Sequence, residues 1–185
     1  MARADPRHRA APALSAMAAD SPSPRRLRDL STDLAVEIGR LERLIEGLGQ
    51  LAARWEREGA SSERVDAAAL RLQSLYTGIE RCLLQIVRVL NGGTPEGSDW
   101  PRRLLQRLTV ANEARPALLS AKSARGLGDL LGFRHVVRHL YSDDLDPAQV
   151  RQRLTAALAL WPVLRTELEA FAGWLQDLIA LAESD

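Results

Sequence analysis

Apolar residues recur every three or four positions along most of the chain, which is the spacing of one face of an α-helix. They outline three long stretches, at about residues 26–58, 62–91 and 147–181, with two shorter stretches at about residues 100–110 and 120–140. No run of alternating apolar and polar residues predicts a strand. The pattern therefore predicts an all-α fold, an up-and-down bundle of four or five helices.

Helix-capping and helix-breaking residues stand at the edges of these stretches. Gly59 is expected to end the first helix, Ser61 or Ser62 can cap the second, and Ser120 can cap the fourth. Asp146 followed by proline is a strong start signal for the last helix, because Asp is a good N-cap and proline suits the first turn. Pro162 lies inside that last stretch and is expected to kink or split it.

The remaining segments read as a tail and connectors. Residues 1–24 are rich in Ala, Pro, Ser and Arg and are expected to be a disordered tail, which leaves residues 25–185 as one helical domain. Met17 remains an alternative start. Residues 92–97 are glycine-rich but lack the residue order of a phosphate-binding loop, so they predict a plain connector. For residues 113–119 a short helix remains open.

Composition narrows the class of protein only modestly. Ala and Leu dominate the apolar residues, which favours helices over sheets. Cys82 is the single cysteine and lies in an apolar helical stretch, so a buried structural thiol and a reducing, cytoplasmic environment are expected. No apolar run approaches the ~20 residues of a membrane helix.

Charge is distributed unevenly although the net charge is only +1. Residues 100–141 hold seven Arg and one Lys against Glu113 and Asp129. A positive block of this kind suits the phosphate backbone of RNA. It is equally consistent with arginines that decorate solvated helix faces.

The positive block ends in a short motif, Arg134-x4-His139-x-Tyr141, that gathers two of the three histidines within five residues. The apolar spacing places it in the last turns of a helix. At about 100° per residue, Arg134 and Arg138 share one face and His135 and His139 share another. A long guanidinium arm can still bring Arg134 near the edge that carries His139.

This spacing resembles the signature of the HEPN superfamily and is most similar to that of HepT-like toxins. Phe133 before the arginine, the polar His135 after it and the acidic Asp-Pro turn beyond belong to the same resemblance, which covers roughly residues 62–160. It implies a metal-independent endoribonuclease that acts as a homodimer in a type VII-like toxin–antitoxin module. The implied partner is a nucleotidyltransferase antitoxin that adenylylates the motif tyrosine, Tyr141.

RNA cleavage without a metal needs a proton acceptor, a proton donor and positive charge near the phosphorus atom. We expect His139 to act as general acid or base and Arg134 to clamp the phosphate. Tyr141 is expected to be an active-site hydroxyl or a modification point, and His135 and Arg138 are secondary contacts. Neither a metal nor another cofactor is expected. Two motifs facing each other across a two-fold axis would supply both histidines, which is a chemical reason for a dimer.

Duller interpretations of the same residues stay open. His135 and His139 form half of a metal site, which Asp143 and Asp144 would have to complete. The two histidines also suit a helix C-terminus, where cations are favoured. Tyr141 reads equally as a tyrosine at the edge of the core. A non-catalytic module that docks a nucleotidyltransferase or a nucleotide is the alternative function.

Overall fold

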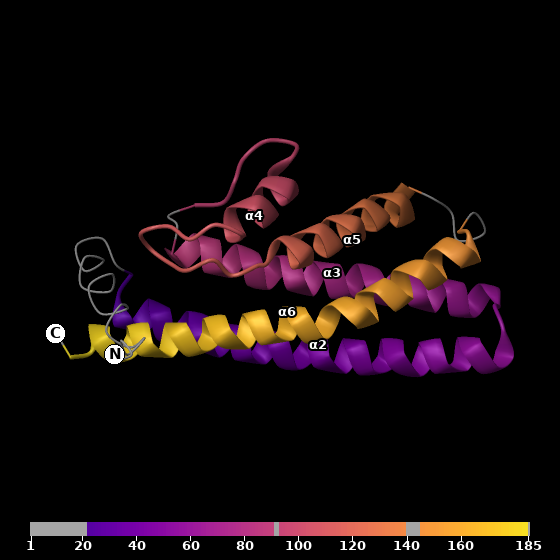
Figure 1. The fold of residues 1–185 in the computed structure, drawn as a ribbon, viewed down its shortest axis with the longest axis horizontal. Coiled ribbons are helices and arrows are strands. Elements are labelled where there is room, and N and C mark those ends of the chain that lie inside the picture. Colours follow the sequence, from indigo (N-terminus) through magenta and orange to yellow (C-terminus); the bar gives the residue numbers. More distant parts are fainter. Residues whose placement is uncertain (1–21, 91–92, 140–144, 185) are drawn as a thin grey trace, which may run out of the picture.

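The protein is described by a computed structural model covering residues 22–90, 93–139 and 145–184, with His139 defined in its backbone only. This part of the chain consists of five helices and no strand, which confirms the all-α prediction (Figure 1). The helices are α2 (Pro24–Glu58), α3 (Ser62–Leu90), α4 (Trp100–Leu108), α5 (Ala121–His139) and α6 (Pro147–Ala182). Residues 1–21 of the expected tail lie outside the described residues.

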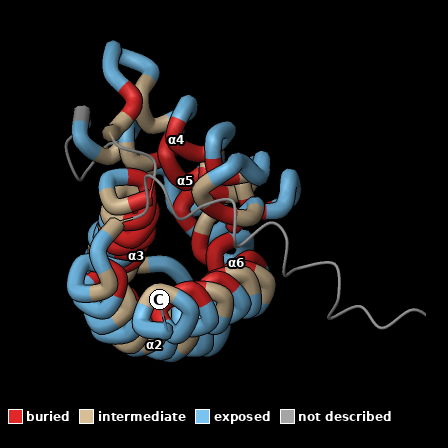
Figure 2. The backbone as a smooth tube through the Cα atoms, turned by 90° about the vertical axis from the view of Figure 1, so that its left-hand side faces the viewer, coloured by how far each residue is buried: buried red, intermediate tan, exposed pale blue. Residues whose placement is uncertain are grey.

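Three long helices form the body of the bundle. α2 packs against both α3 and α6, which also pack against each other, while α5 contacts α3 and α6 on their other side (Figure 1). Buried positions follow the apolar stripes and lie on the sides of the helices that face one another (Figure 2). None of the helices in the described segments is long and apolar enough to cross a membrane.

Capping side chains begin three of the helices where the sequence predicts. The Ser61 hydroxyl accepts a hydrogen bond from the Arg64 amide at 3.3 Å. Ser120 does the same for the Ser123 amide at 3.1 Å, and the Asp146 carboxylate accepts from the Ala148 amide at 2.9 Å. Each bond satisfies an amide that the first helical turn leaves without a partner, so these local sequences are sufficient to fix the helix starts.

α6 continues through Pro162, so the prediction that this proline splits the last helix is wrong. Pro162 lies on the exposed side of α6. There, the carbonyl that loses its helical partner can be hydrated, which limits the cost of the missing hydrogen bond. α6 curves gently along its length, so the proline is accommodated within one helix (Figure 1).

The connector between α4 and α5 is not helical, which closes the alternative left open for residues 113–119. Arg115 is buried, with 2 % of its surface exposed, and it holds this connector together. Its guanidinium donates hydrogen bonds to the carbonyls of Arg107, Val110 and Pro116 at 2.7, 3.2 and 2.9 Å. One cation of the positive block is therefore consumed inside the protein and is not available to RNA.

Two glycines determine where α2 ends and how closely it packs against α3. Gly59 ends this helix as predicted, with φ of 75°, a conformation that side chains with a Cβ rarely adopt. Gly78 of α3 lies where α2 comes close, because a Cβ at that position would stand 2.8 Å from Cδ2 of Leu41. The missing side chain lets the two helices approach closely.

Candidate active site

The motif occupies the end of α5, as predicted, because the helix runs through Arg134, His135 and Arg138 and ends at His139. Tyr141 lies outside the described residues, and so do Asp143 and Asp144. The backbone therefore confirms the helical register from Arg134 to His139. The side chain of His139 lies outside the described part of the chain, so its pairing with Arg134 stays a prediction.

Arg134 is half-buried and turns towards α3. Its guanidinium carbon lies 5.9 Å from the centre of the Tyr76 ring, within the range of a cation–π interaction. Its Nε is buried and has no hydrogen-bond partner among the described residues. The aromatic ring thus fixes the direction of the arginine arm while leaving a buried donor unsatisfied, and such a donor favours any acceptor that reaches it.

Glu80 lies one turn after Tyr76 on α3 and completes a small buried polar cluster. Both side chains are buried, and the Tyr76 hydroxyl interacts with the Glu80 carboxylate. Burial and the negative charge of Glu80 raise the pKa of Tyr76 far above its usual range, while Arg134 lowers it. Oε1 of Glu80 has no hydrogen-bond partner in the described part of the chain.

Sequence reasoning missed this cluster. Tyr76 is part of the predicted apolar stripe of α3, and Glu80 follows it at i+4, on the same side of the helix. A carboxylate on the buried side of a helix is the signal that was available, because buried acids are rare unless they have partners. The partner on α5 could not be identified without the packing of the two helices.

Three of the four residues between Arg134 and His139 are exposed. His135 and Arg138 are exposed, and Val136 between them is 45 % exposed. This face of α5 therefore presents a histidine, an arginine and an apolar side chain to the surroundings. It is the face that a substrate or a second copy of the chain can reach.

An alternative role for His135 and His139 is that of metal ligands. Within residues 22–90, 93–139 and 145–184 no group of three or more His, Cys, Asp or Glu side chains could hold a metal ion. The acids required to complete a site with His135 and His139 lie outside these ranges. What the described geometry offers is an arginine with a free donor and an imidazole-bearing helix end, which suits phosphate binding and proton transfer.

The sequence model of a family described as HepT-like protein matches residues 67–175, more than half of the chain. The match includes nearly all of α3, the whole of α5 and most of α6, but it excludes α2. No curated protein matches the sequence.

Proposed function

The chain belongs to the HepT-like protein family, and from this membership we propose that it is a metal-independent endoribonuclease toxin of a type VII-like toxin–antitoxin module. The observation that carries the proposal is the Arg134-x4-His139-x-Tyr141 motif at the end of α5, inside the matched region. We place the protein in the cytoplasm, where its RNA substrate would be found.

In the proposed reaction His139 removes or supplies a proton and Arg134 stabilises the negative charge on the phosphorane. Transfer of the 2′-hydroxyl proton allows the 2′-oxygen to attack the phosphorus, and protonation of the 5′-oxygen releases that end of the chain. The products are a 2′,3′-cyclic phosphate and a 5′-hydroxyl. The partial exposure of Arg134 supports this role, because a phosphate has to reach the guanidinium from outside the protein.

A homodimer completes the site. One motif offers a single histidine at the matched position, and the reaction needs both a base and an acid. Two copies related by a two-fold axis would bring both histidines to one phosphate. The exposure of His135, Val136 and Arg138 supports an interface at this end of α5, because these side chains are free to meet a second copy.

The proposed antitoxin is a nucleotidyltransferase that adenylylates Tyr141. Adenylylation would place a bulky anion two residues from His139 and would repel RNA both sterically and by charge. Tyr141→Phe is then expected to keep nuclease activity and to escape silencing by the antitoxin. Silencing of this variant to the wild-type extent would contradict the proposed modification site.

The decisive experiment is an RNA cleavage assay in EDTA. Wild type should cleave, and His139→Ala should lose ~10²–10⁴-fold in the chemical step, the usual contribution of a positioned acid or base. Arg134→Lys should also be impaired, because an ammonium group cannot reproduce the guanidinium fork. Arg125→Lys is the matched control, since Arg125 is exposed on the same helix more than two turns before Arg134, and it should cleave nearly as well as wild type. Dependence on a divalent metal, or full activity of His139→Ala, would overturn the mechanism.

The alternative is a non-catalytic module that docks a nucleotidyltransferase or a nucleotide. One observation favours it: the guanidinium of Arg134 packs on Tyr76, as a structural arginine would. In that case wild type would not cleave RNA, and Arg134→Lys would lower the stability of the fold. The cleavage assay and a thermal melt of these two proteins therefore separate the two functions.

A further inference from the structure

A groove lined by arginines follows the contact between α2 and α3, away from the Tyr76 side of α3. We call it the basic groove. The residues that line it are Arg40, Arg43, Leu44, Gly47, Gln50 and Arg71. No acidic residue lines it, so the groove has a local excess of positive charge.

Arg40 shares the carboxylate of Glu37 with Arg81, whereas Arg43 and Arg71 have no such partner in the described part of the chain. Glu37 is buried, and its carboxylate accepts hydrogen bonds from Arg40 at 3.0 Å and from Arg81 at 3.2 Å. Arg43 and Arg71 form no ion pair with any described carboxylate. These two guanidinium groups therefore account for the free charge of the basic groove.

Gly47 holds Arg71 in place across the groove. The Arg71 guanidinium donates a hydrogen bond to the Gly47 carbonyl at 2.7 Å. A Cβ at position 47 would stand 2.8 Å from the Nη1 atom of Arg71, so the absence of a side chain makes this contact possible. One of the five donors is used, and the planar group remains able to bind an anion through the others.

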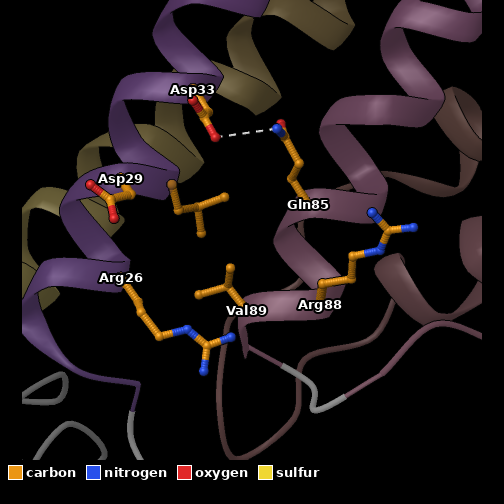
Figure 3. A pocket seen from close by; sticks show the side chains of 7 residues that line it. Arg26, Asp29, Asp33, Gln85, Arg88 and Val89 are labelled. Carbon is orange, nitrogen blue, oxygen red and sulfur yellow. Dashed lines mark hydrogen bonds between the residues drawn. The ribbon is translucent and has the colours of Figure 1, made fainter.

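A second groove on the same pair of helices shows that arginine alone does not create such a site. Arg26 of α2 and Arg88 of α3 line it together with Asp29 and Asp33 (Figure 3). Asp33 accepts a hydrogen bond from Gln85 at 3.3 Å, and this bond links the two helices. Positive and negative charges are equal in number there, and a polyanion gains little from such a surface.

We propose that the basic groove binds phosphate groups of the RNA backbone at a place separate from the cleavage site. The identity of the ligand rests on the proposed function. Guanidinium groups bind two phosphate oxygens at once. Arg43 and Arg71 line the same groove from facing helices, so one strand lying in the groove would meet both. Five of the six lining residues belong to α2, which lies outside the residues matched by the family model.

The test is binding of a 2′-O-methyl RNA oligonucleotide, which cannot be cleaved, measured by fluorescence anisotropy at a series of salt concentrations. Each phosphate contact to a single strand contributes roughly 0.7 to the slope of log affinity against log salt. Arg43→Gln/Arg71→Gln should therefore lower the slope by roughly 1.4. Arg43 forms no hydrogen bond or ion pair with the described residues, so Arg43→Gln alone should lower the slope by roughly half as much without disturbing the fold.

Arg26→Gln/Arg88→Gln is the matched control, since it removes the same charge from the same two helices. It should leave the slope unchanged. An equal loss in both double variants, or an unchanged slope in the groove variants, overturns the proposal. Binding is read without cleavage, so an inactive wild-type protein would refute the ribonuclease while leaving the groove measurement valid.

Discussion

Tyr76 connects the buried carboxylate of Glu80 to the arginine of the motif, and its ring and hydroxyl have separable roles. Tyr76→Phe keeps the ring beneath Arg134 but removes the hydroxyl that interacts with Glu80. We expect cleavage within a few-fold of wild type and a loss of ~1–3 kcal/mol in the free energy of unfolding, the cost of an unsatisfied buried polar group. Urea unfolding and initial cleavage rates measure the two effects.

Tyr76→Leu is the companion variant, because it removes the ring as well. It should reduce cleavage more than Tyr76→Phe does, since Arg134 loses the surface that directs it. Equal cleavage by the two variants would show that the ring does not position the arginine.

Cys82 gives a pH dependence with a defined sign. Burial raises the pKa of its thiol from 9.0 to about 12. The unfolded chain therefore loses the thiol proton at lower pH than the folded protein does, so this group's contribution to stability is complete below pH 9 and declines as the pH rises towards 12. Urea unfolding at pH 8 and pH 10.5 should show a larger decline for wild type than for Cys82→Ala. An identical decline in both would contradict the assignment.

At the scale of the helix, we expect two glycines to respond in opposite ways to substitution by alanine. Gly49 of α2 has open space where a Cβ would be, whereas a Cβ on Gly78 of α3 would collide with Leu41. Gly49→Ala should stabilise the fold by up to ~1 kcal/mol, because alanine is the better helix former. Gly78→Ala should destabilise it, because two long helices would have to separate. Thermal melts of the two variants provide the comparison.

The helices themselves could be predicted because their signals are local. Apolar spacing gave their number, and Ser61, Ser120 and Asp146 gave three of their starts within a residue. The prediction of a split at Pro162 failed because the cost of proline depends on whether it faces solvent, which depends on neighbouring helices. The irregular connector at Arg115 likewise depends on carbonyls that only the folded chain brings together.

The candidate site could be predicted only in part for the same reason. The motif and its place at a helix end follow from spacing along one segment. The ring beneath Arg134, the buried carboxylate of Glu80 and the basic groove each require two helices in a defined register. Sequence periodicity predicts which side of a helix is buried, but it does not predict which residue of the next helix lies opposite.

At the scale of the molecule, the proposed composite site requires that two chains meet at the end of α5. Val136 is 45 % exposed between His135 and Arg138. Val136→Glu should place like charges across a two-fold interface and yield a monomer without nuclease activity. Leu70→Glu is the control, since Leu70 is 64 % exposed on α3. Sedimentation at micromolar concentration should show a dimer for wild type and for the control. An active monomer would refute the composite site.

α2 and α6 are the first and last helices of the described chain, and they pack against each other. This pairing affects when the protein can fold. Ser31 and Gln176 are bonded across 145 residues, and Arg28 and Glu183 across 155. At a synthesis rate of ~5–20 residues per second, α6 emerges from the ribosome after the other helices. Until then the apolar stripe of α2 lacks one of its two partner helices. The bundle is therefore completed only after α6 has left the ribosome, and until then the nascent chain carries α5 on an unfinished support.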